Sequence, residues 1–286
     1  MTTNQLLIVP ADPLNQRRPD EHFADEAEAA RTLGMTVAVV DLDALEHGHT
    51  REAIRRIPDA DEAVYRGWML TSDTYRVMAE GLAVRGTTLQ TSPDQYKAAH
   101  ELPGWYAPLA EHTPESVWTS SASIDEFVEV ASSFGSGPVV LRDYVKSMKH
   151  YWHEAAFIPD VSDRTAAVGV ARRFVELRGD SFTGGFVLRR FERFVPPEVR
   201  RWWIRRHLAL VTAHPDTPDQ LPPAAADFSI FADSVRAIRL PFVTVDATQD
   251  DAGAWRIVEL GDGQVSDRPK STPPATLISY LNNTKD

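Results

Sequence analysis

The chain has 286 residues, of which 43% are hydrophobic and 25% charged, and its formal net charge is -11. This length and apolar content are enough for one large core or two modest ones, and they exclude wholesale disorder. The negative charge argues against general attraction to nucleic acid or anionic lipid. The lack of cysteine excludes disulfides, thiolate metal sites and thiol nucleophiles.

The first apolar run is Leu6–Val9, which is too short for a signal peptide and is not preceded by a basic region. No stretch approaches the roughly 20 apolar residues that a membrane span needs. We therefore expect a cytoplasmic protein with no membrane partner.

The first hundred residues alternate between predicted strands and helices. The strands are expected at Leu6–Val9, Thr36–Val40, Ala63–Arg66 and Thr87–Leu89, and the helices at Asp20–Leu33 and Ser72–Val84. This order predicts a small doubly wound sheet with right-handed crossovers. The first strand is followed by Pro10–Pro13 rather than by a glycine-rich fingerprint, so a dinucleotide site is not supported.

The pattern changes after a segment rich in proline and polar residues, 92–118, which is expected to be a connection. The elements predicted beyond it are strands at Ser116–Trp118, Val139–Arg142, Phe186–Arg189, Val199–Val211, Phe242–Ala247 and Trp255–Leu260, and helices at Ile124–Phe134 and Asp163–Arg178. The chain is therefore expected to be α/β first and α+β afterwards.

The C-terminal predicted hairpin carries carboxylates at the strand ends. Asp246 ends one strand, Glu259 ends the other, and the polar turn 261–264 follows. Carboxylate oxygens together with water and substrate phosphates suit Mg²⁺. An alternative is that the two carboxylates are solvated strand-end charges beside an ordinary turn.

A cluster of basic residues follows the predicted strand at Val139: Arg142, Lys146 and Lys149 come in quick succession. A lysine on a buried strand is costly unless an anion compensates it, and a nucleotide phosphate would do so. An alternative is a strand that runs out into a solvated basic turn.

The predicted strand around Val199 is rich in arginine and tryptophan. Alternation places Arg200, Trp202, Ile204 and Arg206 on one face and Arg201, Trp203, Arg205 and His207 on the other. A nucleic-acid platform is one interpretation, but the net charge and the absence of an RNA-binding motif argue against it. A central strand whose arginines meet phosphates or carboxylates fits better. The nine histidines show no zinc-ligand spacing.

Taken in order, three segments resemble the ATP-grasp superfamily: Val139–Ile158, Phe186–Arg206 and Phe242–Pro269. They are most similar to its divergent clade named for an arginine and two lysines. That clade also includes bacterial ATP-grasp domain proteins and the eukaryotic cell-division-cycle protein that assembles translation initiation factor 2. The resemblance implies a Rossmann-like pre-ATP-grasp domain at 1–92 and an ATP-grasp domain at 93–286. The small lobe would lie at about 115–190 and the large lobe at about 191–286.

The resemblance implies roles for the basic residues. Lys146 would contact the nucleotide phosphates from the small-lobe strand, beside Arg142 and Lys149. Lys97 occupies the place of an earlier phosphate-binding lysine. Arg200 would stabilise the transferred γ-phosphoryl group.

The resemblance also implies an adenosine site and a metal site. Arg189 to Phe191 would form the hinge under the adenine, and Glu192 would receive the ribose hydroxyls. Asp246 and Glu259 would hold Mg²⁺. The family usually has asparagine two residues after the second metal carboxylate, whereas this chain has Gly261 followed by Asp262, which would take over coordination or leave one metal site weaker.

We therefore expect ATP and Mg²⁺ as cofactors, and a ligase that joins the carboxylate and the amine of small molecules or peptides through an acyl-phosphate. Arg66 and Arg206 are the candidate substrate residues; an ordinary surface turn is the alternative for Arg66 and its neighbour Trp68. A nucleotide-dependent assembly factor and an RNA-binding module are the competing functions. A homodimer is left open.

Overall fold

The computed structural model describes residues 5–223, 227 and 229–282. Residues 1–4 and 283–286, at the outer ends of the two predicted domains, lie outside this description. The chain forms two compact units, each assembled from separate stretches. The first unit comprises Met1–Ala99, Pro197–Ala247 and Leu260–Asp286, and the second comprises His100–Pro196 and Thr248–Glu259. The predicted boundary at residues 92 and 93 stays a prediction.

The first unit contains a largely parallel sheet. Its strands are β1 (Leu6–Asp12), β2 (Asn15–Pro19), β3 (Thr36–Val40), β4 (Glu62–Tyr65) and β5 (Thr88–Leu89). Strand β1 pairs in parallel with β3 and with β4, and β4 pairs in parallel with β5. Strand β2, which the sequence pattern did not reveal, turns back antiparallel to the end of β1. The central strand β1 is buried along its apolar run, as that unbroken run predicts.

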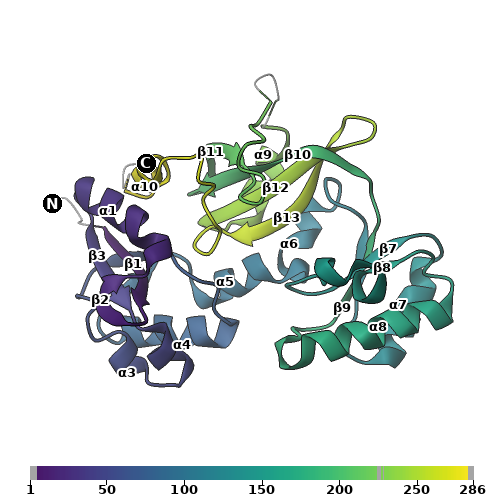
Figure 1. The fold of residues 1–286 in the computed structure, drawn as a ribbon, viewed down its shortest axis with the longest axis horizontal. Helices are drawn as coiled ribbons and strands as arrows, with labels where there is room; N and C mark the ends of the chain where they lie inside the picture. Colours follow the sequence, from purple (N-terminus) through teal and green to yellow (C-terminus); the bar gives the residue numbers. More distant parts are fainter. Residues whose placement is uncertain (1–4, 224–226, 228, 283–286) are drawn as a thin grey trace. The chain divides into compact units, whose positions relative to one another are not determined.

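The first unit also contains six helical elements within the described part of its first hundred residues. They are η1 (Glu21–Phe23), α1 (Ala24–Thr32), α2 (Leu42–Glu46), α3 (Thr50–Ala53), α4 (Ser72–Ala83) and α5 (Pro93–His100). The last helix of the chain, α10 (Pro274–Asn282), packs against α1, and Figure 1 shows these two elements from opposite ends of the chain side by side. The sequence pattern did not predict α10, whose Leu277, Ile278 and Leu281 join the same buried cluster as Leu7 and Val9.

A second sheet has the strand order β11–β10–β12–β13. Its strands are β10 (Phe194–Ile204), β11 (His207–Ala213), β12 (Phe242–Asp250) and β13 (Trp255–Asp262), and the short helices η5 (Ser229–Phe231) and α9 (Ala232–Ile238) lie between β11 and β12 in the chain. Within the first unit, Trp202 of β10 and Phe242 of β12 pack into the core that also holds β1 residues. One apolar core therefore joins residues from both ends of the sequence.

The second unit contains an antiparallel sheet with the order β6–β9–β7–β8. Its strands are β6 (Ser116–Trp118), β7 (Val139–Asp143), β8 (Phe157–Ile158) and β9 (Phe186–Arg190), and its helical elements are α6 (Leu102–Leu109), α7 (Ile124–Phe134), η2 (Lys149–Tyr151), η3 (Trp152–Ala156), α8 (Arg164–Arg178) and η4 (Gly179–Ser181). Phe127 of α7, Phe174 of α8 and Phe186 of β9 lie in its buried centre. Helix α7 begins with a Ser123 side chain that accepts the Glu126 amide, as an N-cap serine does.

Segment 92–118 is not the predicted connection, because it contains α5 and α6. Its prolines were interpreted as loop residues, whereas Pro93 opens α5, a position where proline is favourable. The Ser92 hydroxyl accepts the Gln95 amide at 3.3 Å, and the Gln95 side-chain oxygen accepts the Ser92 amide at 2.9 Å. This reciprocal pair is a capping box, whose serine and glutamine were visible in the sequence.

The predicted strand Val199–Val211 is also wrong, because it is a hairpin of β10 and β11. Its turn is formed by Arg205 and Arg206, with φ values of 50° and 67°. Such turns usually contain glycine or asparagine, because arginine seldom adopts this left-handed conformation. The sequence therefore contained no signal for a turn at these two residues. The alternation of faces therefore does not extend to Arg206, which is exposed in the turn.

None of the helices in the described part of the chain combines the length and the apolar composition that a membrane span requires.

A buried ion pair joins β4 to helix α1 in the first unit. Arg66, directly after β4, donates from Nε and Nη2 to both oxygens of Glu26 on α1, each at 2.8 Å. Burial raises the pKa of Glu26, but Arg66 and Arg268 lower it more, so the net shift is downward. A carboxyl with a lowered pKa contributes stability above its ordinary pKa and loses it as the pH falls through the folded value.

We therefore expect Glu26→Gln to lower the free energy of unfolding by about 3–5 kcal/mol at pH 7, because Arg66 would keep a buried charge without its partner. The difference from wild type should begin to shrink as the pH falls below the ordinary glutamate pKa of about 4.3, and it should vanish only below the lowered pKa of the folded state, where wild-type Glu26 is also neutral. Urea unfolding at both pH values measures it.

The matched control is Glu28→Gln on the same helix, whose ion pair with Arg31 is exposed. This substitution should change stability by less than about 0.5 kcal/mol. Equal effects of the two substitutions would contradict a dominant role for the buried pair.

Candidate functional site

The predicted phosphoryl-binding arginine and the first predicted metal ligand contact each other in the first unit. Arg200 of β10 donates from Nε and Nη2 to the two oxygens of Asp246 on β12, both at 2.8 Å. Burial raises the pKa of Asp246, but the Arg200 guanidinium and His214 lower it more, to about 2. Asp246 is therefore ionised throughout the neutral range.

Glu198 and His214 lie beside this pair. Each of Glu198, His214 and Asp246 has a side-chain oxygen or nitrogen that could bind a metal ion, and these atoms lie within 4.8 Å of one another. His214 Nδ1 accepts the Asp216 amide at 3.2 Å, and its Nε2 lies 3.4 Å from Arg200 Nη2 and 3.6 Å from Asp246 Oδ2. This group was not predicted, because Glu198 and His214 meet only across the hairpin that had been interpreted as one strand. The signal available was the carboxylate two residues before Arg200.

Two of the predicted nucleotide-binding arginines are buried in the second unit. Arg142 of β7 donates to Glu259 Oε1 at 2.9 Å and to the Val145 carbonyl at 2.6 Å. Arg189 of β9 donates to Thr113 and to main-chain carbonyls of β13. Burial, followed by repulsion from Arg142, lowers the pKa of Arg189 to about 9, so this guanidinium is still charged at neutral pH.

Lys146 lies in a turn after β7 rather than on the predicted strand, which ends at Asp143. The Asp143 carboxylate accepts the backbone amides of Val145 at 2.8 Å and Lys146 at 2.6 Å, and the Arg178 Nε at 2.8 Å. The side chain of Lys146 is exposed. Asp143 is fully buried, so it fixes the turn that carries the lysine, although no sequence pattern singled it out.

The other predicted cations are exposed: Lys97 lies on α5, Lys149 on η2 and Arg206 in the β10–β11 turn. Lys97 and Arg206 belong to the first unit and Lys149 to the second. Their predicted roles stay predictions.

The predicted adenosine residues follow β9 in the second unit. Phe191 is partly exposed and packs against Phe157, with ring centroids 5.3 Å apart. Glu192 accepts two hydrogen bonds from Arg256, both at 2.8 Å. Glu192 and Arg256 also line an open cavity of about 460 Å³, together with Trp255. This hollow provides room for a ligand beside the carboxylate predicted to receive the ribose.

Asp262 is buried and faces the residue two places after it. Its oxygens accept the Gln264 amide at 2.7 Å and the Gln264 side-chain nitrogen at 3.4 Å. Burial raises the pKa of Asp262 to about 7, because these bonds and Arg66 compensate only part of the desolvation. Coordination of a metal by Asp262 would require it to lose a proton and leave these bonds, although the predicted role stays a prediction.

Arg66 is fully buried and bonds the carbonyls of Gly263, Gln264 and Ser266 at 2.6, 3.2 and 2.9 Å, in addition to Glu26. Its contacts therefore hold the loop after β13, whereas its neighbour Trp68 is exposed. The substrate role predicted for Arg66 stays a prediction.

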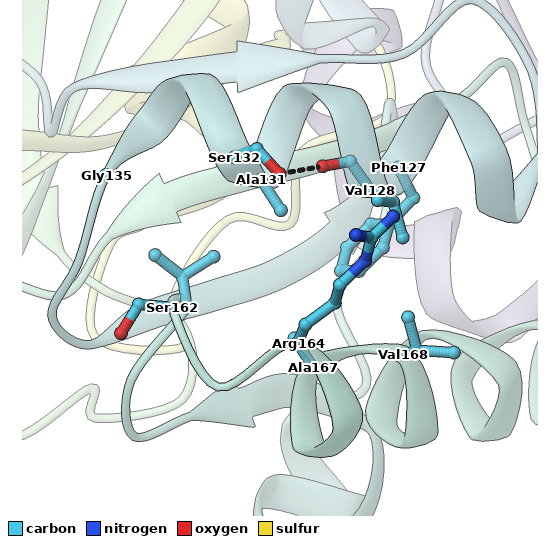
Figure 2. A pocket seen from close by; sticks show the side chains of 10 residues that line it. Phe127, Val128, Ala131, Ser132, Gly135, Ser162, Arg164, Ala167 and Val168 are labelled. Carbon is cyan, nitrogen blue, oxygen red and sulfur yellow. Dashed lines mark hydrogen bonds between the residues drawn. The ribbon is translucent and has the colours of Figure 1, made fainter.

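A separate cavity of about 210 Å³ lies between α7 and α8 of the second unit. Figure 2 shows that Arg164 extends from the start of α8 toward Phe127 and Val128 on α7. The wall consists mostly of apolar side chains, and none of the residues predicted for the site contributes to it.

Comparison with known proteins adds an independent finding. The family model that matches describes an ATP-grasp domain, family 3 of the clade named for an arginine and two lysines. It matches residues 133–281, which is more than half of the chain. No curated protein matches.

Three solved structures share the fold over nearly the full length of both chains. The "RimK domain protein ATP-grasp from Sphaerobacter thermophilus" has a TM-score of 0.65 at 15% identity and covers 98% of each chain. The D-cycloserine synthetase DcsG has a TM-score of 0.62 at 17% identity and covers 97% of this chain and 98% of its own. The ATP-grasp ligase PsnB with its minimal precursor has a TM-score of 0.58 at 13% identity, with 98% and 99% covered.

These matches confirm the predicted ATP-grasp fold and clade. That the N-terminal part is a pre-ATP-grasp domain stays a prediction.

The Lys146 turn generates a test. We expect Asp143→Asn to accelerate hydrogen exchange of the Val145 and Lys146 amides by about tenfold or more, because both amides bond Asp143 Oδ1 and would exchange a charged acceptor for a weaker neutral one. Exchange measured by NMR or mass spectrometry checks this.

Asp160→Asn is the matched control, since Asp160 accepts the Gly137 and Ser162 amides in a similar arrangement elsewhere in the second unit. It should leave the amides of residues 145 and 146 unchanged. Unchanged exchange in Asp143→Asn would refute the role given to Asp143.

Proposed function

The chain belongs to the ATP-grasp family, in family 3 of the clade named for an arginine and two lysines, and from this membership we propose that it is an ADP-forming ligase that joins a carboxylate to an amine. The substrates proposed are small molecules or peptides. Two of the structures that share its fold are named as a D-cycloserine synthetase and as the ligase PsnB complexed with a precursor peptide, which supports both substrate sizes.

The observation that carries the proposal is the pair of buried arginines, Arg142 and Arg189. The Arg189 guanidinium carries charge at neutral pH, and the carboxylate that contacts Arg142, Glu259, has a side chain that is 46% exposed. Buried guanidiniums are stable only when anions or carbonyls compensate them, and the phosphates of a nucleotide are the strongest such acceptors. The exposed Lys146, held on its fixed turn, would supply a further positive charge.

Arg200 is proposed to bind the phosphoryl group during its transfer. Its planar fork already matches the two oxygens of Asp246, and the same geometry matches two phosphate oxygens. Exchange of a carboxylate for a phosphoryl group would place the guanidinium where negative charge develops.

The residues present fit Mg²⁺ at two of the three predicted positions. Asp246 is ionised and would exchange Arg200 for the cation, and Glu259 has one oxygen on Arg142 and a side chain that is 46% exposed. When bound, Mg²⁺ would neutralise the phosphates and orient them for transfer. Asp262 fits less well, because its pKa is raised to about 7.

In the proposed reaction, a carboxylate oxygen of the substrate attacks the γ-phosphorus of ATP and ADP leaves, which gives an acyl-phosphate. The amine nitrogen then attacks the carbonyl carbon, phosphate leaves, and a proton is released. Arg200 and Lys146 would stabilise the charge on the transferring group.

We expect Arg200→Ala to lower the rate of ADP release by about 100-fold to 1,000-fold while ATP still binds. Asp246→Asn and Glu259→Gln should abolish turnover. Lys146→Ala should weaken ATP binding and leave the folded structure unchanged. Calorimetry with Mg-ATP, followed by ADP release across a panel of amino acids and peptides, measures these effects.

Arg172→Ala, which removes an exposed arginine from α8, is the control and should behave as wild type. Wild-type ATP affinity in a Glu259→Gln, Lys146→Ala double variant would overturn the nucleotide site. ATP binding with a stable protein partner and no ADP release for any pair offered would favour the assembly-factor alternative.

A further inference from the structure

The parallel sheet of the first unit has a defined edge for ligands. Its parallel strands lie in the order β3–β1–β4–β5. Strand β3 is added on one side of β1 and β4 on the other, so the direction in which strands are added reverses at β1. In open α/β sheets, ligands bind outside the carboxyl ends of the strands at this reversal point. Here that point lies where β1 and β4 end, and the residues that follow β4 are Arg66, Gly67 and Trp68.

An aromatic patch lies beside this edge, made of His22 and Trp68 over Phe23. The rings of His22 and Trp68 are 4.6 Å apart, and Phe23 meets Trp68 edge-on at 5.1 Å. Phe23 is buried, but the side chain of His22 is 45% exposed and Trp68 is 43% exposed. The patch therefore presents two fixed ring surfaces to solvent above an apolar support.

Carboxylates hold both rings of the aromatic patch. Asp20 accepts the Trp68 indole Nε1–H at 3.2 Å, and Asp267 lies 2.8 Å from His22 Nε2. A carboxylate only accepts, so His22 Nε2 carries a proton. Asp267 is 49% exposed on its side chain, so its charge faces the same solvent as the rings. Aromatic faces and carboxylates together attract cations and repel anions.

The loop that carries Trp68 is held by several bonds. Tyr65 donates its hydroxyl to the Trp68 carbonyl at 2.8 Å, and Gly67 donates its amide to the Gln264 carbonyl at 3.1 Å. A Cβ on Gly67 would lie 2.3 Å from the Tyr65 hydroxyl, so only glycine allows this close turn. These contacts fix the backbone of the loop, and the fixed backbone keeps the Trp68 side chain exposed.

The aromatic patch is linked to the residue proposed to bind the phosphoryl group. The Asp267 carbonyl accepts Arg200 Nη1 at 2.9 Å, while the Asp267 side chain contacts His22. A ligand on the patch would therefore contact the same residue that bonds Arg200, within the first unit.

We propose that the aromatic patch binds the amine substrate as its ammonium ion, with the apolar body of the amine on Trp68 and its charge toward Asp267 and Asp20. This inference rests on the proposed ligase function and names the class of acceptor: a primary amine attached to an apolar group. A carboxylate of the same size would be repelled here.

The test uses the full chain without nucleotide, labelled with ¹⁵N at tryptophan, and follows the Trp68 indole signal by NMR. Butylammonium chloride is the probe, and sodium butyrate at equal ionic strength is the matched anion. Butylammonium should shift the Trp68 signal saturably. Butyrate should not shift it, and the signal of the buried Trp105 should respond to neither ion.

Asp267→Asn keeps an acceptor for His22 and removes the charge, so it should weaken butylammonium binding about threefold to fivefold. Asp59→Asn, which removes another exposed carboxylate, paired with Arg85, is the control and should bind as wild type. An unsaturable shift, an equal response to butyrate, or wild-type binding in Asp267→Asn would overturn the proposal.

A second measurement separates this inference from the proposed function. With a turning-over substrate pair, Trp68→Ala should raise the KM for the amine about fivefold or more and leave the KM for ATP unchanged. ADP release with no dependence on Trp68 would overturn the patch and leave the ligase standing. Butylammonium binding to a protein that never releases ADP would leave the patch standing as a cation site and overturn the ligase function.

Discussion

The arrangement of the first unit depends on the dehydrated guanidinium of Arg66. It joins Glu26 near the start of the chain to the carbonyls of residues 263, 264 and 266 near its end. A buried charge with this many acceptors fixes the geometry, because the loss of any acceptor leaves part of it uncompensated. The loop after β13 is thereby held against the end of β4, and this loop carries Asp267, whose carbonyl bonds Arg200. The position of Arg200 is thus set partly by the contacts of an arginine far earlier in the chain.

Three of the buried arginines, Arg66, Arg142 and Arg189, differ in how their charge is compensated. Arg66 is neutralised by Glu26, a carboxylate that is itself buried and has a lowered pKa, and its contacts support the fold. Arg142 bonds Glu259, whereas Arg189 contacts only neutral oxygens through its described hydrogen bonds, and burial and Arg142 lower its pKa. A buried guanidinium that bonds neutral oxygens favours a nearby anion. The same residue type therefore supports the fold in the first unit and would support nucleotide binding in the second.

Sequence patterns predict the elements whose signal is local. The apolar runs at Leu6 and Thr36 and the helix Ile124–Phe134 are placed as predicted, because period and caps are written within ten residues or so. The hairpin at Arg205 and Arg206 was not predicted, because its turn depends on the pairing of β10 with β11 and not on turn residues. Helix α10 was missed for a related reason: its partner α1 lies near the other end of the chain, and no local signal records that contact.

Some residues of the candidate site were likewise predicted from the sequence, and others were not. Arg200 and Asp246 were both singled out from the sequence, and they do meet. The roles of Asp143 and His214 were not predicted, because they depend on neighbours that the fold brings together: a guanidinium on α8 for Asp143, and a carboxylate on β12 for His214.

Two aspartates in the C-terminal part of the first unit show why residue type alone could not assign the metal end. Asp246 and Asp262 are both almost fully buried, and burial by itself raises the pKa of each. Asp246 lies against a bidentate guanidinium, which brings its pKa to about 2. Asp262 has mainly the amide groups of Gln264, which leave its pKa at about 7. A divalent cation must displace any proton on a carboxylate that it binds, so of these two aspartates the proposal favours Asp246, whose oxygens would exchange Arg200 for the cation. The carboxyl group of Asp262 instead accepts the amide groups of Gln264 and secures the turn that follows β13.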